Sequence, residues 1–390
     1  MKDGESKYAY KKKSAWEQFS KQQITTAYAF AEGYKTFLND AKTEREAIRR
    51  IAEASKKQKK KVVINQEKAA AIIIKGKKPV RDGLRIVISH IDSPRLDLKQ
   101  VPLFQDSESH LALFETHYYG GIKKFQWVVI PLALHGVIVK KDGKKITFTL
   151  GEDDGDPVFS VPDLLPHLSH DVQDNKKIDE AIKAESLDIV IGSLPARGDF
   201  KEKIKAALLE KLHTDYDITE QDFISAELEA VPAFKARDIG FDRSLVGAYG
   251  QDDRICAYAA LQAALDVKTP EHTVLVLFVD KEEIGSEGNA SAQATAFLRS
   301  LIRELDANVD IDSVLLKSKV ISADVSSAVT PNYIDVFELK NASSLGNGVV
   351  MSKYTGHGGK YSANDASAEY IAEIRGLLDK AKVPWQTGEL

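Results

Sequence analysis

Histidine and acidic residues follow three apolar, β-branched runs of this 390-residue chain. The segments are RIVISHIDSP (85–94), TVLVLFVDKEEIGS (273–286) and KVISADVSSAV (319–329). Because open α/β sheets place their chemistry at the carboxyl ends of strands, we expect these side chains to meet at one edge of a sheet. An imidazole, several carboxylates and no thiolate describe a site for a hard or borderline divalent metal.

The first candidates are a histidine with a nearby aspartate and an adjacent pair of glutamates. His90 and Asp92 are two positions apart, so both face the same side of an extended backbone. His90 can bind a metal while Asp92 orients its ring. Glu282 and Glu283 must point in different directions, so one can ligate a metal while the other acts as a general base.

Further carboxylates come from GQDDRICAYAALQAAL and ISADVSS. Asp252 and Asp253 stand at the predicted start of an apolar helix, where acidic residues also serve as caps. Two consecutive aspartates exceed what a cap needs, and one carboxylate could bridge two metal ions about 3.5–4 Å apart. Asp324 would add a further ligand.

Composition and charge argue against several classes of partner. The chain is 43% hydrophobic and has a formal net charge of −4, which gives no electrostatic basis for binding nucleic acid or membrane. The single cysteine, Cys256, excludes an internal disulfide framework and a cysteine-rich zinc site. No apolar stretch reaches membrane-spanning length, and no apolar segment follows the basic amino-terminal residues. We expect a cytoplasmic protein.

The pattern of apolar residues predicts two kinds of structure. Residues 14–55 read as helical, with a capping box at Thr43 and Glu46. Residues 101–235 read as a β-rich module with a KDGKK hairpin turn and a helix over 199–212. The predicted organisation is an α/β domain formed by 1–100 and 236–390, into which the β-rich domain is inserted.

Seven segments together resemble a known family. In chain order they are SHIDSPRLDLK, YYGGI, VPDLLPHL, GQDDR, DKEEIGS, SADVSSAVTPNY and KYSAN. They are similar to the aspartyl aminopeptidases, a family of dinuclear zinc exopeptidases, and to its bacterial branch in particular. The resemblance implies a phosphorylase/hydrolase-like α/β metallopeptidase domain and an inserted domain that mediates dimerisation. It also implies dimers that assemble into a dodecamer.

The resemblance further implies a role for each site residue. Two zinc ions per subunit would activate a metal-bridged water that hydrolyses the amino-terminal peptide bond of a peptide. His90 and Asp324 would hold one zinc, Asp252 would bridge, and Glu283 would ligate the second. The catalytic residues would be Glu282 as general base, Asp92 as the orienting acid, His167 reaching a neighbouring subunit's active site, and Tyr361 near the substrate.

Three features depart from the family pattern. Ser327 stands where members with acidic preference carry a histidine, and Met351 stands where they carry a lysine, although Lys353 lies two residues on. Without a fixed cation there, we expect aminopeptidase activity without strict preference for amino-terminal Asp or Glu. The family also supplies a later histidine to the second zinc, whereas no histidine follows His357 in this sequence.

Those departures leave alternatives open. With only Asp252 and Glu283 as ligands, a second zinc would lack a closed four-coordinate site. A catalytically impaired homologue that acts in assembly or peptide binding is therefore one alternative to the aminopeptidase. A dinuclear amidohydrolase acting on a non-peptide amide is another.

Overall fold

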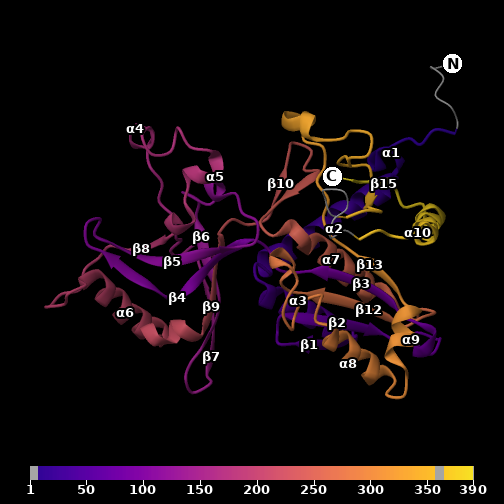
Figure 1. Cartoon of the computed structure of the whole chain (residues 1–390), viewed down its shortest axis with the longest axis horizontal. Coiled ribbons are helices and arrows are strands. Elements are labelled where there is room, and N and C mark those ends of the chain that lie inside the picture. The colour runs from indigo at the N-terminus through magenta and orange to yellow at the C-terminus, as the bar shows by residue number, and fades with distance from the viewer. Residues whose placement is uncertain (1–7, 356–363, 390) are drawn as a thin grey trace. The chain divides into compact units, whose positions relative to one another are not determined.

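The computed structural model describes residues 8–355 and 364–389 (Figure 1). Contacts within the chain define two compact units. The larger unit is residues 33–324, and the smaller comprises the described parts of 1–32 and 325–390. No helix within these described ranges is both long and apolar enough to cross a membrane.

The first sheet of the larger unit contains the three runs that carry the candidate residues. Its order is β1 (Lys61–Asn65), β2 (Ala69–Ile74), β12 (Val274–Val279), β3 (Arg85–His90) and β13 (Lys319–Ser322). β12 and β13 pair with β3 from its two sides, and both run parallel to it. Their carboxyl ends therefore share one edge, as the sequence predicts.

Helices cover both faces of this sheet (Figure 1). On one face, Ile72 and Phe278 pack with α2 (Lys21–Asp40), α3 (Glu44–Lys57) and α7 (Gln251–Asp266). On the other, Leu275 and Leu277 pack with α8 (Thr295–Leu305) and α9 (Ile311–Leu316). Burial on both faces explains why these strands are continuous apolar runs.

The stretch predicted to be β-rich supplies most of a six-stranded antiparallel sheet. Its order is β7 (Lys145–Leu150), β6 (Leu132–Val139), β9 (Ala226–Pro232), β4 (Arg95–Asp106), β5 (Leu111–Tyr119) and β8 (Ile189–Gly192). The KDGKK turn joins β6 to β7 as expected. The predicted helix is α6 (Lys203–Tyr216), and short helices α4 (Pro166–Ser169) and α5 (Ile178–Ala181) lie nearby in the sequence. The domain boundaries at 101 and 235 stay a prediction.

A buried ionic cluster joins α3 to the six-stranded sheet. The predicted capping box of α3 is present, and its Glu46 also accepts from Nδ1 of His135 in β6 at 2.9 Å. Nε2 of His135 lies 3.0 Å from Oε1 of Glu152. Burial disfavours the charged imidazole, but the hydrogen bonds to the two glutamates outweigh burial and raise the pKa of His135.

The remaining elements are short. A hairpin of β10 (Arg237–Ile239) and β11 (Leu245–Gly247) precedes α7. The smaller unit holds α1 (Ala15–Gln18), α10 (Ala368–Ala381) and the parallel pair β14 (Val349–Met351) and β15 (Trp385–Thr387). Short 3-10 helices occur at Val80–Asp82, Lys124–Gln126, Ala184–Ser186, Glu220–Ser225, Glu282–Ile284 and Pro331–Val336.

Candidate metal centre

His90 is the last residue of β3, and its ring has one nitrogen available for a ligand. The residue is 3% exposed. Nδ1 lies 3.1 Å from the carbonyl oxygen of Asp92 and 3.3 Å from its Oδ1. Because both neighbours are acceptors, Nδ1 keeps a proton, and Nε2 is the nitrogen that a metal ion would bind in place of its proton.

Three carboxylates approach that nitrogen from different elements. The distances from Nε2 are 3.1 Å to Asp252 Oδ1, 3.7 Å to Asp324 Oδ1 and 3.8 Å to Glu282 Oε2. The side chain of Asp252 is 51% exposed, and those of Asp324 and Glu282 are similar. A buried imidazole under half-exposed carboxylates leaves the site open to solvent, as a catalytic metal centre requires.

The ligand atoms fall into two groups that share His90. One contains His90, Asp252 and Glu283, the other His90, Glu282 and Asp324, and within each group the atoms lie within 4.8 Å of one another. Since Nδ1 is taken by Asp92 and only Nε2 points to the carboxylates, the imidazole can serve one ion. The sequence predicts that each of these residues belongs to the site, and the structure brings all of them together.

The carboxylates of this cluster repel one another, so a bound cation would stabilise them. Burial opposes a charged His90, but hydrogen bonds with Asp252, Asp324 and Asp92 prevail and raise the pKa of His90. Burial and the charge of Asp252 raise the pKa of Glu283 to about 7. Burial also raises the pKa of Glu282. A divalent metal would relieve this repulsion among carboxylates, and an imidazole with carboxylates suits zinc. The residues therefore fit such an ion.

Asp92 holds both halves of the site in place. Its side chain is completely buried. Oδ1 accepts from the backbone N–H of Glu282 at 3.2 Å, and Oδ2 accepts from that of Glu283 at 3.2 Å. Asp92 also approaches Nδ1 of His90, and its role as the orienting acid stays a prediction that these contacts support.

The backbone around Glu282 and Glu283 turns tightly. They begin the 3-10 helix Glu282–Ile284, which lies between Lys281 (φ 71°) and Gly285 (φ 101°). Left-handed conformations at both ends reverse the chain directly after β12, and glycine adopts such a φ without steric cost. The turn presents the two adjacent side chains to different ligand groups.

Asp252 and Asp253 have different surroundings, although the sequence shows them as a pair. They open α7 with non-helical backbone angles, and the peptide bond between them is cis. Ser93 Oγ donates to the carbonyl oxygen of Asp252 at 2.6 Å. Asp253 is fully buried, and burial raises its pKa to about 8. Of the two aspartates, only Asp252 belongs to one of the ligand groups found among the described residues.

One predicted site residue lies elsewhere in the structure, and another falls outside the described residues. His167 is exposed on α4 and is outside the clusters of His, Asp and Glu found in the described chain. Tyr361 lies outside the described residues, as does His357. The sequence did not single out Ser93, which donates to Asp252, or Tyr119, whose hydroxyl donates to Asp92. Both stand in segments that carry the family resemblance, SHIDSP and YYGGI, but neither has a residue type that signals metal chemistry on its own.

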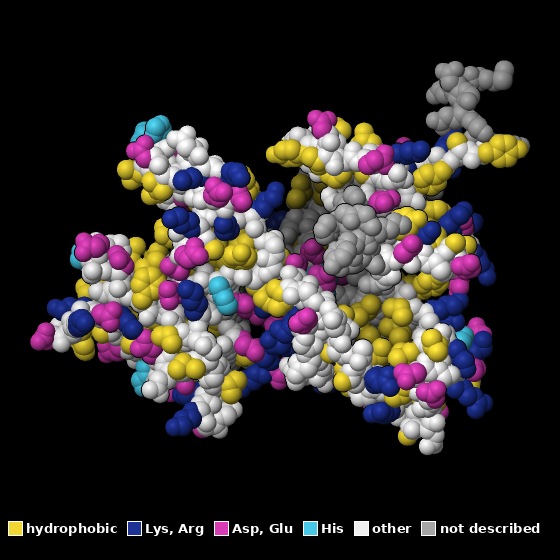
Figure 2. Space-filling model, viewed as in Figure 1, with side chains coloured by type: hydrophobic (Ala, Val, Ile, Leu, Met, Phe, Trp, Pro, Cys, Tyr) yellow, Lys and Arg dark blue, Asp and Glu magenta, His cyan; other side chains and the backbone are white. Residues whose placement is uncertain are grey.

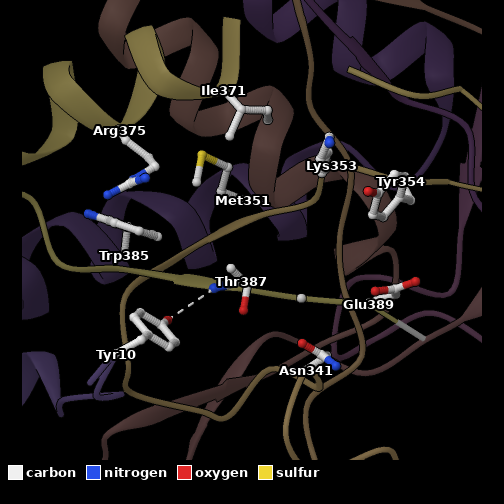
Figure 3. Close-up of a pocket in the computed structure, with 11 residues that line it drawn as sticks. Tyr10, Asn341, Met351, Lys353, Tyr354, Ile371, Arg375, Trp385, Thr387 and Glu389 are labelled. Atoms are coloured by element: carbon white, nitrogen blue, oxygen red, sulfur yellow. Dashed lines mark hydrogen bonds between the residues drawn. The ribbon is translucent and has the colours of Figure 1, made fainter. Parts of the chain in front are cut away.

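The smaller unit contains a cavity of about 440 Å³ (Figure 3). Met351 and Lys353, the positions singled out for substrate charge, line it together with Arg375 and Trp385. The guanidinium carbon of Arg375 lies 5.7 Å from the centre of the Trp385 ring. The cavity therefore has two cationic side chains beside aromatic walls.

Comparison with known proteins places the chain in a family. The family described as aminopeptidase I zinc metalloprotease (M18) matches residues 31–390. The probable M18 family aminopeptidase 1 of Clostridium acetobutylicum is 45% identical, with 97% of this chain and 86% of the relative covered. That of Thermotoga maritima is also 45% identical, with the same coverage.

Solved structures agree with this assignment. The crystal structure of the Thermotoga maritima M18 aminopeptidase superposes with a TM-score of 0.92 at 44% identity, covering 97% of this chain and 87% of that one. Aminopeptidase I from Clostridium acetobutylicum gives a TM-score of 0.91 at 44% identity, covering 98% and 87%. The chain belongs to the M18 family of zinc metallo-aminopeptidases.

Proposed function

We propose that the cluster around His90 is the centre at which this aminopeptidase hydrolyses the amino-terminal peptide bond. The observation that carries the proposal is the convergence of carboxylates from three separate chain segments on Nε2 of one buried imidazole. His90, Asp252 and Asp324 would hold one zinc ion. Asp252 and Glu283 would contribute to a second.

Each side chain has a distinct task in this proposal. Bound zinc supplies Lewis-acid polarisation and lowers the pKa of water. Glu282 is half-exposed, and its backbone is held by Asp92, so its carboxylate can accept a proton from the attacking water and pass it to the leaving amine. Asp92 keeps the proton of His90 on Nδ1 and so leaves Nε2 for the metal.

Substitution of the proposed base tests this assignment. In Glu282→Gln, release of amino-terminal residues from a panel of aminoacyl-anilides should fall by at least about 100-fold, because general base catalysis is removed. Zinc content should stay at the parent level. Glu287→Gln is the matched control, since Glu287 is exposed on the same loop. Parent-like turnover by Glu282→Gln would contradict the role of Glu282.

The alternative of an impaired homologue is not favoured, because relatives at 45% identity are named aminopeptidases. Adding acylated amino acids to the substrate panel tests the second alternative, an amidohydrolase that acts on a non-peptide amide. Zinc content per chain distinguishes one ion from two.

We further propose an amino-terminal preference that is not strictly acidic. Met351 offers no charge, and Lys353 Nζ lies 5.0 Å from the Tyr354 ring centre. Similar kcat/KM values for Leu- and Asp-anilides would support this preference. A hundredfold advantage for Asp would contradict it.

A homo-oligomer is also part of the proposal. Apolar side chains stay exposed along residues 158–178, including Leu168 at 60% and Ile178 at 65%. Contiguous exposed apolar patches mark contact surfaces, so the gathering of these side chains in one segment supports the proposal. Light scattering should give a mass that is a multiple of 43.1 kDa.

We place the enzyme in the cytoplasm because the chain has a single cysteine. On the face in Figure 2, basic and acidic side chains are interspersed.

A further inference from the structure

Tyr119, the last residue of β5, reaches the metal centre from the six-stranded sheet. Its hydroxyl donates to Oδ2 of Asp92 at 2.8 Å. The residue is 8% exposed. Burial and the nearby charge of Asp92 raise the pKa of the phenol, so the hydroxyl keeps its proton. Tyr119 is therefore a fixed donor to the carboxylate that orients His90.

The hydroxyl completes the set of donors around Asp92. Oδ2 accepts from Tyr119 and from the backbone N–H of Glu283, while Oδ1 accepts from the N–H of Glu282 and lies 3.3 Å from Nδ1 of His90. A carboxylate that accepts on both oxygens cannot rotate without breaking several bonds at once. The hydroxyl thereby restrains the imidazole and the glutamate turn together.

Arg95 holds the Tyr119 ring itself. The two residues are direct cross-strand partners between β4 and β5. The guanidinium carbon of Arg95 lies 3.8 Å from the ring centre, a cation–π contact in a buried setting. Nε of Arg95 lies 2.8 Å from Asp97 and 3.1 Å from Glu229, so the guanidinium is fixed in turn.

The residue after Tyr119 gives an independent indication that this segment abuts the site. A Cβ added at Gly120 would lie 3.1 Å from Cβ of Glu283 and 3.3 Å from its Oε2. Gly120 has a φ of +71°. The strand end therefore packs directly against a proposed metal ligand as well as against Asp92.

We propose that Tyr119 is a positioning residue of the metal centre, acting through Asp92 to set the His90 ring and the Glu282–Glu283 turn. The inference rests on the proposed function only in that His90 binds zinc. It makes the end of β5, in the six-stranded sheet, part of the machinery that sets metal affinity.

Removing one oxygen atom tests the proposal. Tyr119→Phe keeps the ring under Arg95 and removes only the donor. Loss of a side chain that bonds a metal ligand directly weakens metal binding by roughly 10- to 100-fold. Because Tyr119 acts one contact further out, through Asp92, we expect the zinc Kd to rise by about 10-fold, the lower end of that range, measured by competition with a chromophoric chelator. The absorption spectrum of the cobalt-substituted protein should shift, because His90 and Glu283 are no longer held in one geometry.

Tyr118→Phe is the matched control. Tyr118 is the neighbouring residue of β5, and it is 49% exposed. Its substitution should leave the zinc Kd and the cobalt spectrum unchanged. The melting temperature of each metal-free variant shows whether the fold is intact.

The outcomes separate the two claims. If Tyr119→Phe keeps the parent's zinc Kd and cobalt spectrum, the positioning role is wrong, whatever happens to the melting temperature. If the parent binds zinc but releases no amino-terminal residue, the proposed function fails, yet the comparison of Kd values still decides the role of Tyr119. If the parent binds no zinc, both claims are overturned.

Discussion

Replacing Asp92 by asparagine is the sharpest test of how the metal centre is held together. The change is nearly isosteric, so it leaves no cavity. It removes the charge and turns one of two acceptor atoms into a donor. Asp92 faces donors on both oxygens: the N–H groups of Glu282 and Glu283, the Tyr119 hydroxyl and Nδ1 of His90. Whichever way the amide is oriented, two of these donors lose their acceptor.

The magnitude follows from that count. Hydrogen bonds to a charged acceptor contribute about 1.5–3 kcal/mol each, so two lost bonds correspond to about 3–6 kcal/mol. Removing a buried charge beside other carboxylates recovers part of this loss, which leaves a net decrease of about 2–4 kcal/mol in the free energy of unfolding. The zinc Kd should rise by roughly 10- to 100-fold, or about 1.4–2.7 kcal/mol.

Two assays measure these effects separately. Urea unfolding of the metal-free protein gives the change in stability, and chelator competition gives the zinc Kd. Asp82→Asn serves as control, since Asp82 is exposed and lies before β3. If Asp92→Asn binds zinc with the parent's Kd and unfolds at the parent's urea midpoint, the reasoning that Asp92 organises the site is refuted.

Three further changes have defined outcomes. Gly120→Ala should lower the free energy of unfolding by about 1–2 kcal/mol, because alanine is strained at the left-handed φ of Gly120. The added Cβ should also displace Glu283 and so lower activity. Gly121→Ala, where nothing lies within 4 Å of the added Cβ, should be close to neutral in the same urea and turnover assays. The pKa of His135 is raised, so its contribution to stability is complete below about pH 6.5 and is lost as pH rises through the folded-state pKa. The difference in unfolding free energy between parent and His135→Gln should shrink over that range, and a constant difference would contradict the argument. Phe278→Ala leaves a cavity at a fully buried position, so guanidinium titrations should show a decrease of about 3–5 kcal/mol in the free energy of unfolding. A decrease below about 1 kcal/mol would be inconsistent with this packing.

The sequence predicted the edge of the sheet at which the site lies. Runs such as VLVLFV are buried on both faces, so their apolar character is continuous and their ends are marked by the first polar residues. His90 and the glutamate pair could therefore be placed at strand ends from the order of residue types alone. Which strands are neighbours could not be predicted, because the pairing of β3 with β12 and β13 joins segments far apart in sequence and leaves no local pattern.

The support around the ligands was less predictable. The proposed role of Asp92 could be inferred from its spacing to His90, whereas the Tyr119 hydroxyl reaches Asp92 from another sheet. Likewise, nothing in the dipeptide Asp252–Asp253 tells which aspartate faces the site and which is buried. Such assignments depend on contacts between distant segments and not on residue type.

The position of β3 between β12 and β13 has a consequence for how the protein matures. His90 and Asp92 come together within one local segment, but Asp252, the glutamate pair and Asp324 join them only when the long connections to β12 and β13 have closed. Long-range closures of this kind are slow steps in folding. A refolding chain should therefore take up zinc late, and the time course of metal uptake would report the completion of folding, not its onset.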